Sequence, residues 1–175
     1  MSSYPPVKIG LLGLGTVGGG VTHVLARNAE EISRRAGREI LISHAAARNL
    51  DSTTARTAGI KLTGEALEVV NDPDISIIVE LLGGYEPARS LVLRALANGK
   101  HVVTANKALI AKHGNEIFAA ARTAGMMVGF EAAVAGGIPI IKAIREGLAG
   151  NHLEWVAGII NGTANFILTE MRDKG

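Results

Sequence analysis

Short apolar runs alternate with amphipathic stretches along most of this chain. The apolar runs predict strands at residues 7–14, 39–47, 75–82, 101–104 and 126–132. The amphipathic stretches between them predict helices at residues 17–36, 63–71, 87–97 and 108–124. Strands that alternate with helices are typical of a parallel sheet with helices on both faces. The pattern therefore predicts an α/β fold with a doubly wound parallel sheet.

Turn-forming and capping residues mark the ends of several predicted helices. Gly37 follows the first helix, and Asn98-Gly99 follows the third, as expected at helix C-termini. Thr63 is the expected N-cap of the second helix, because its hydroxyl can accept a hydrogen bond from a free backbone N–H.

The alternation of apolar runs and amphipathic stretches changes near residue 134. The stretch VAGGIPIIKAIREGLAGN predicts a glycine-rich turn and a helix, and a strand is expected over residues 153–161, followed by another helix. One strand and two helices do not bury their apolar faces alone. We therefore predict a nucleotide-binding domain over residues 1–133. Residues 134–175 would form a hinge and the incomplete beginning of an α+β domain.

Composition narrows the possible functions. The 175 residues include 18 Lys and Arg against 16 Asp and Glu, with few aromatic residues, so a nucleic-acid partner is not expected. The absence of cysteine excludes disulfides, thiolate metal sites and thiol nucleophiles within this chain. No long apolar segment indicates a signal peptide or a membrane span, so no membrane partner and a cytoplasmic location are expected.

A GxGxxG motif joins the first predicted strand to the first helix, and it consists of Gly13, Leu14, Gly15, Thr16, Val17 and Gly18. In this context the motif is typical of a Rossmann-type dinucleotide-binding domain. Gly13 would make the tight turn, Gly15 would let the backbone approach a pyrophosphate, and Gly18 would let helix and strand pack closely. The helix N-terminus would offer its N–H groups to the phosphates.

The end of the second predicted strand bears on the choice between NAD and NADP. An acidic residue there would bind the ribose 2′-hydroxyl of NAD, but this segment reads Ala47-Arg48-Asn49. A guanidinium can bind a 2′-phosphate with two hydrogen bonds, so Arg48 favours NADP, with NAD still possible. The alternative is that Arg48 is a solvated loop residue.

The remaining strand ends are candidate site segments, because ligands of open parallel sheets bind beyond the carboxyl ends of the strands. The third strand ends in ELLGG, where Gly83 permits close approach of the cofactor or belongs to an ordinary turn. The fourth ends in TANK. Lys107 in that segment can contact the cofactor or exchange a proton, unless it is a solvated residue at a helix start.

The fifth predicted strand runs into Glu131 and a glycine-rich turn. A carboxylate together with several backbone carbonyls is the ligand set that a hard cation prefers. The same residues fit a hinge in which Glu131 caps a backbone group. From spacing alone, the hinge is the favoured interpretation.

Five motifs together resemble the homoserine dehydrogenases, in family order and over essentially the whole chain: IGLLGLGTVGGGV, ELLGG, VVTANKALIA, FEAAVAGGIPII and GIINGTANFILTEM. The resemblance implies an NAD(P)-dependent enzyme that interconverts L-homoserine and L-aspartate 4-semialdehyde in threonine, methionine and isoleucine biosynthesis. It also implies a nucleotide-binding domain followed by a catalytic domain that binds substrate and forms a homodimer in the full-length protein.

The resemblance further implies roles for individual residues. Lys107 would take part in proton transfer, and Thr104 and Ala105 would line the nicotinamide side. The turn that faces the substrate would consist of Asn161, Gly162 and Thr163. A sodium ion would be held by Glu131 and the carbonyls of Val134, Gly136 and Ile138, which replaces the hinge interpretation.

The family also has a later segment, with acidic residues that bind homoserine and a second catalytic lysine, and this segment does not occur before Gly175. The chain is therefore expected to be an N-terminal fragment with little or no activity alone. Aspartate-semialdehyde dehydrogenase is a weaker match, because its chemistry requires a cysteine nucleophile. A non-catalytic NAD(P)-binding module is the alternative function.

Overall fold

The computed structural model describes residues 4–49, 58–158 and 162–174, and its centre is a parallel six-stranded sheet of order β3-β2-β1-β4-β5-β6. The strands are β1 (Val7–Leu12), β2 (Ile40–Ala46), β3 (Lys61–Thr63), β4 (Ile77–Glu80), β5 (His101–Thr104) and β6 (Val128–Gly129). Every neighbouring pair is parallel. The predicted α/β fold is confirmed, and this strand order is that of the Rossmann-type dinucleotide-binding domains.

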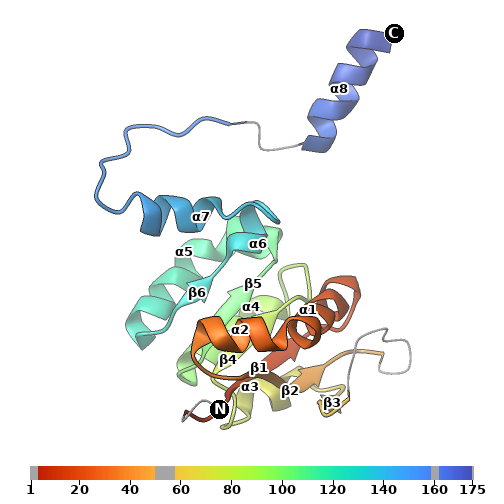
Figure 1. Ribbon diagram of the computed structural model, residues 1–175, viewed down its shortest axis with the longest axis vertical. Helices are drawn as coiled ribbons and strands as arrows, with labels where there is room; N and C mark the ends of the chain where they lie inside the picture. The colour runs from red at the N-terminus through yellow and green to blue at the C-terminus, as the bar shows by residue number, and fades with distance from the viewer. Residues whose placement is uncertain (1–3, 50–57, 159–161, 175) are drawn as a thin grey trace.

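The sheet is covered by helices on both faces (Figure 1). The helices around it are α1 (Thr16–Arg27), α2 (Ala29–Ala36), α3 (Ala66–Asn71), α4 (Ala88–Ala97) and α5 (Lys107–Ala124). Because successive strand residues point to opposite faces, Leu11 and Leu12 belong to two different core clusters. Leu12 packs with residues of α3, α4 and α5, whereas Leu11 packs on the side of α1.

The single helix expected over residues 17–36 is wrong, because α1 and α2 are separate helices that meet at Asn28. Asn28 adopts φ −110° and ψ 20°, and it is at once the C-cap of α1 and the N-cap of α2. Asparagine is more stable at caps than inside helices, because its side chain competes for backbone hydrogen bonds. The predicted end at Gly37 is confirmed by its left-handed φ of 73°.

Two further boundaries differ from expectation. Thr63 is the last residue of β3, a strand that the sequence did not predict, and α3 begins only at Ala66. The Thr63 hydroxyl accepts a hydrogen bond from the Glu65 N–H at 3.0 Å, so it acts just outside the helix rather than as its N-cap. The strand expected over 126–132 is confined to Val128–Gly129, and α6 (Glu131–Val134) follows.

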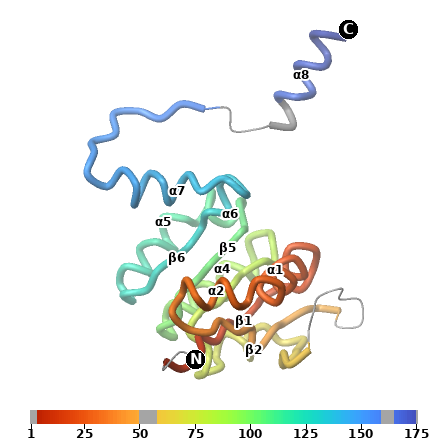
Figure 2. The backbone as a smooth tube through the Cα atoms, viewed as in Figure 1, coloured from red at the N-terminus to blue at the C-terminus, as the bar shows by residue number. Residues whose placement is uncertain are grey.

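The C-terminal part consists of α7 (Ile140–Lys142), a π-helical turn η1 (Ala143–Gly147) and α8 (Gly162–Lys174). The strand expected over 153–161 is wrong for its described residues, 153–158, which hold no strand. Trp155 is 77% exposed there, and a strand without a neighbour leaves its backbone groups unpaired. Figure 2 shows this extended segment leaving η1, with α8 set apart from the sheet.

Across the described residues, no helix has the length and apolar character that crossing a membrane requires.

Candidate functional site

The carboxyl ends of β1 and β4 form the topological switch point of the sheet. These two strands are neighbours, whereas β2 continues the sheet on one side and β5 on the other. The backbone closes tightly here, because the Leu81 N–H donates to Leu12 O at 2.8 Å and the Gly13 N–H donates to Ala46 O at 2.9 Å. Ligands of doubly wound sheets bind in the crevice at such a point.

The glycines of the motif have distinct roles in this crevice. Gly13 has a φ of 102°, and a Cβ atom there would lie 2.9 Å from Leu81 O. A Cβ atom on Gly18 would lie 2.0 Å from Gly13 O, so any side chain at this position would force the backbone to shift. A Cβ atom on Gly15 would enter open space, which leaves the backbone accessible to a ligand. The predicted division of tasks among the three glycines is consistent with this geometry.

The amino end of α1 is suited to an anion. Gly15, Thr16 and Val17 are exposed, whereas Leu14 is buried against the sheet. No side chain of the described residues caps α1 at Gly15. The first backbone N–H groups of a helix then point outward, and the helix dipole favours a negative group beside them.

Arg48 and Gly83 line one cavity of about 370 Å³ beside the glycine loop. The cavity lies between the end of β2, the start of α3 and the segment after β4. Its lining residues are Ala46, Ala47, Arg48, Gly64, Glu65, Ala66, Leu67, Leu82, Gly83, Glu86, Pro87 and Leu91. The surface is mostly small and apolar, with one guanidinium and the two carboxylates of Glu65 and Glu86. The small apolar part suits a flat base, and the guanidinium suits the phosphate of a phosphorylated sugar.

A buried polar network connects the ends of β4 and β5, and two of its members, Glu80 and Asn106, were not assigned from the sequence. Thr104 donates its hydroxyl hydrogen to Glu80 Oε2 at 2.6 Å and accepts the Asn106 N–H at 3.0 Å. Asn106 caps α5 by accepting the Leu109 N–H at 3.1 Å. The available signal was a charged residue that ends an apolar strand, together with an asparagine directly before a helix.

Lys107 is the first residue of α5 and is exposed. Its Nζ donates a hydrogen bond of 3.3 Å to the carbonyl oxygen of Ala132, in α6. Ala105 is half-buried beside it, whereas the Thr104 side chain is fully buried in the polar network. Lys107 therefore lies at the carboxyl edge of the sheet, where it can reach a ligand in the crevice.

Glu131 caps α7 in this structure. Its Oε1 accepts the Ile141 N–H at 2.8 Å, and its Oε2 accepts the Lys142 N–H at 3.0 Å. This is the capping role that belonged to the hinge interpretation of the sequence. Ile138, another predicted cation ligand, accepts the Ile140 N–H with its carbonyl at 2.8 Å. Within the described part of the chain, no group of three or more His, Asp or Glu side chains is arranged to hold a metal ion.

The predicted substrate turn is described only in part. Asn161 lies outside the described residues, and Gly162 and Thr163 open α8, which Figure 1 shows apart from the carboxyl edge of the sheet.

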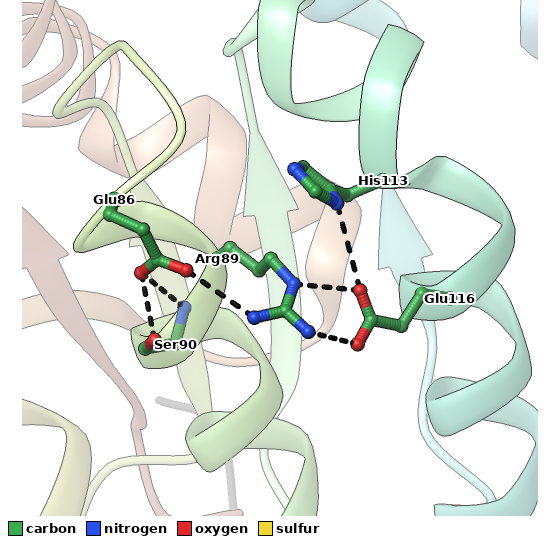
Figure 3. A network of polar contacts seen from close by, with 5 residues as sticks. All are labelled: Glu86, Arg89, Ser90, His113 and Glu116. Atoms are coloured by element: carbon green, nitrogen blue, oxygen red, sulfur yellow. Dashed lines mark hydrogen bonds and ion pairs between the residues drawn. The ribbon is translucent and has the colours of Figure 1, made fainter.

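An ion-pair network joins the start of α4 to α5 (Figure 3). Arg89 binds both carboxylate oxygens of Glu116, and the contact between Arg89 Nε and Glu116 Oε2 measures 2.7 Å. Arg89 also reaches Glu86 Oε1 at 3.3 Å, and Glu86 accepts the Ser90 hydroxyl at 2.7 Å. Hydrogen bonding by Arg89 holds the pKa of Glu116 below its usual value. The network anchors the segment that follows the Gly83-Gly84 turn.

At the amino end of the sheet, buried polar groups hold the loop between α3 and β4. Lys100 Nζ donates to the carbonyl oxygens of Asp72, at 2.5 Å, and Ile75, at 2.8 Å, and burial lowers the pKa of this lysine. His44 Nδ1 lies 3.0 Å from Asp72 Oδ2. These groups lie at the edge opposite to the crevice, so we regard them as structural.

Comparison with known proteins identifies similar sequences and structures. The family described as "Homoserine dehydrogenase, NAD binding domain" matches residues 13–131, and that described as "Homoserine dehydrogenase" matches residues 139–175. A homoserine dehydrogenase of Pseudomonas aeruginosa is 62% identical over 170 residues, which cover 97% of this chain and 39% of that protein.

Solved structures similar to this chain are homoserine dehydrogenases as well. A homoserine dehydrogenase from Thiobacillus denitrificans superimposes with a TM-score of 0.91 at 69% identity, over 97% of this chain and 39% of that one. A hyperthermophilic archaeal homoserine dehydrogenase in complex with NADPH gives a TM-score of 0.78 at 26% identity, over 98% of this chain and 58% of that one. The chain thus spans about two fifths of the length of its bacterial relatives.

Proposed function

Because the chain belongs to the homoserine dehydrogenase family, we propose that it is the nucleotide-binding part of an enzyme that interconverts L-homoserine and L-aspartate 4-semialdehyde with NADP(H). The observation that carries this proposal is the juxtaposition of two features at one edge of the sheet. The backbone at Gly15, after β1, is open enough for a pyrophosphate to approach. Lys107 lies at the same edge of the sheet, after β5, which is two strands from β1.

The residues of the crevice fit a dinucleotide. Gly13, Leu14, Gly15, Thr16, Val17 and Gly18 would hold the pyrophosphate against the amino end of α1. The cavity beside Arg48 would take the adenosine end, with the guanidinium on a 2′-phosphate. NADP is therefore the proposed cofactor, in keeping with the NADPH complex of the archaeal relative, and NAD is the alternative.

The nicotinamide would lie near Thr104 and Ala105, with Gly83 between it and the adenosine cavity that this glycine lines, and when bound it would accept hydride from the alcohol carbon or return it to the aldehyde. Lys107 would take the hydroxyl proton during oxidation, and in the reverse direction its ammonium would polarise the aldehyde oxygen. The hydrogen bond to Ala132 O supports this role, because it holds the long side chain at the crevice.

The second part of the chain completes the proposal. Residues 134–175 would begin the substrate-binding domain, with Asn161, Gly162 and Thr163 facing homoserine, and the full-length protein would be a cytoplasmic homodimer. The exposed Trp155 and Phe166 are consistent with a surface that another segment or subunit covers.

The sodium site rests on the resemblance alone. Glu131 and the carbonyls of Val134, Gly136 and Ile138 are all oxygen donors, which suits a hard cation. However, both Glu131 oxygens already accept backbone N–H groups of α7. A sodium ion would have to share this carboxylate with the helix, through the remaining lone pairs.

The test compares Lys107→Ala with the unaltered protein in the complete enzyme, with homoserine oxidation followed by NADPH absorbance. We expect kcat to fall by about 100-fold or more, because general acid–base catalysis commonly contributes that much. The dissociation constant of NADP should change by less than about threefold. Arg122→Ala removes another exposed basic residue of α5, in its last turn, and is the matched control.

An unchanged kcat in Lys107→Ala would show that the catalytic assignment is wrong. A complete protein that binds NADP but oxidises no homoserine would favour the alternative, a non-catalytic NAD(P)-binding module. The 175-residue chain alone should turn over homoserine poorly, because it covers only 39% of the Pseudomonas aeruginosa homoserine dehydrogenase.

A further inference from the structure

The function proposed above leaves one buried carboxylate without a role. Glu80 is the last residue of β4, and none of its surface is exposed. Its Oε1 accepts the Leu82 N–H at 2.8 Å, and its Oε2 accepts the Thr104 hydroxyl at 2.6 Å. The Asn106 side chain contributes a longer contact of 3.5 Å to Oε1. Because burying a carboxylate among neutral donors is costly, these donors must all be directed at it.

The hydrogen bonds continue from Glu80 in two directions. Along β4, the Leu82 bond orients the turn that contains Gly83 and Gly84, and Asn106 Nδ2 donates to Gly84 O at 2.7 Å. Along β5, Thr104 accepts the Asn106 N–H, and Asn106 accepts the Leu109 N–H in the first turn of α5. Lys107 lies within this first turn.

We propose that Glu80 is a positioning residue, which sets the Leu82–Gly84 turn and the Asn106–Lys107 helix start in one fixed relation. If the function proposed above is correct, the first segment lines the cofactor crevice and the second carries the proton-transferring lysine. The carboxylate then acts on the reaction through both segments without touching the substrate. Small misalignments of reacting groups reduce rates strongly, so the effect falls on the chemical step.

A carboxylate is specifically suited to this place. It is an acceptor at both oxygens, and each oxygen faces a donor: the Leu82 N–H and the Thr104 O–H. Glu80→Gln keeps the volume but replaces the charged acceptor with a neutral amide, whose NH₂ group would face the Thr104 hydroxyl when its oxygen accepts the Leu82 N–H. The network must then reorient, whereas the apolar packing of β4 is unchanged.

The first test measures amide hydrogen exchange in the complete enzyme without cofactor. We expect Glu80→Gln to speed exchange at the Leu82 and Asn106 amides by about tenfold or more, because the Leu82 N–H loses a charged acceptor and the Thr104 hydroxyl that accepts the Asn106 N–H must reorient. The control is Ile78→Val, a buried apolar residue of the same strand, which should leave both amides unaffected. Unchanged exchange at both amides in Glu80→Gln would overturn the proposal whatever the enzyme does.

The second test measures kinetics. We expect Glu80→Gln to lower kcat for homoserine oxidation by about tenfold or more, with KM and the NADP dissociation constant within about threefold. The melting temperature should stay near that of Ile78→Val. Faster exchange with an unchanged kcat would overturn the positioning role. If the complete enzyme oxidises no homoserine at all, the proposed function is wrong. The exchange measurements then still test the hydrogen-bond network around Glu80.

A second pair of variants guards against misfolding of Glu80→Gln. Thr104→Ser keeps the hydroxyl that links Glu80 to Asn106, whereas Thr104→Val removes it at similar volume. We expect slow exchange of the Asn106 amide in the serine variant and fast exchange in the valine variant. Equal exchange in the two variants would contradict the proposed link.

Discussion

A Cβ atom on Gly18, in the first turns of α1, would lie 2.0 Å from the carbonyl oxygen of Gly13. This contact is far shorter than any non-bonded approach of a carbon to an oxygen. The glycine is therefore required by the packing of the helix against its own entry loop, and not by flexibility. The same loop carries the open backbone at Gly15, so a shift caused by a side chain at Gly18 would also displace the segment proposed to bind the pyrophosphate.

Gly18→Ala should destabilise the protein by about 1–3 kcal/mol, as is typical of overpacked positions. Gly20→Ala is the matched control, because Gly20 lies in the same helix and a Cβ atom there meets nothing within 4 Å. Alanine at that position should stabilise the helix by up to about 1 kcal/mol. Urea unfolding of both variants measures the difference, and equal stabilities would contradict the close contact.

Arg48→Ala should weaken NADP binding by about 10-fold to 100-fold, because a charge-assisted hydrogen bond contributes about 1.5–3 kcal/mol. NAD, which lacks the 2′-phosphate, should bind within about twofold of the unaltered protein. Fluorescence titration with both cofactors in the complete enzyme tests this. Arg35→Ala, on the exposed surface of α2, should change neither affinity. An equal loss of affinity for NAD and NADP would show that Arg48 does not bind the 2′-phosphate.

Asp72 should make stability depend on pH in the acidic range. Burial raises the pKa of this carboxyl group, but hydrogen bonds from the Asp74 amide and His44 outweigh that effect and leave the pKa below its usual value. A folded-state pKa below the unfolded value means that the unfolded state binds the proton first. The stabilisation is therefore complete above the unfolded pKa and is lost as pH falls through the lower folded pKa.

Asp72→Asn is the corresponding variant. It should be less stable than the unaltered protein from about pH 5 to pH 7, and the difference should shrink as pH falls below about 4. Urea unfolding across this range measures it. A difference that grows toward low pH would contradict a lowered pKa of Asp72 in the folded state.

The Arg89–Glu116 pair should stabilise the contact between α4 and α5 in a salt-dependent way. Both side chains are partly exposed, at 32% and 43%, so dissolved ions screen the pair. Arg89→Ala and Glu116→Ala should each lower the melting temperature, and the double variant should lower it by less than the sum. In about 1 M NaCl the coupling should largely vanish. Coupling that persists at high salt would show that the two hydrogen bonds between the guanidinium and the carboxylate, rather than the attraction of their charges, provide the stabilisation.

The sequence predicted well those features that depend on neighbours along the chain. The centres of β1, β2, β4 and β5 and nearly the whole of α4 and α5 lie where the hydrophobic pattern predicts them. The pattern failed where a competing local preference or a tertiary contact decided. Asn28 interrupts a helix that periodicity would continue, and β3 has only three residues, too few for a periodic signal. The segment 153–158 has a strand pattern, but the structure places no strand there.

The candidate site divides in the same way. Gly13, Gly15, Gly18, Arg48 and Lys107 could be named from motif and strand order, because parallel strands bring their carboxyl ends to one edge. Glu80 could not, since the role of a carboxylate at the end of an apolar strand depends on its contacts with Thr104, on the neighbouring strand, and with Asn106, the N-cap of α5. Glu131 shows the converse: the residues suggested both a cap and a cation ligand, and the fold directs both oxygens to the amides of α7.

The fold class, the family and the edge of the sheet at which a nucleotide would bind all follow from the amino-acid sequence alone. They depend on local periodicity and on glycines whose requirement is local. Three-dimensional packing was needed to establish which groups are buried together, which hydrogen bonds they make, and that one carboxylate joins the Leu82–Gly84 turn to the start of α5. Hydrogen bonding and burial depend on the distances between segments far apart in the chain, and no pattern along the chain contains those distances.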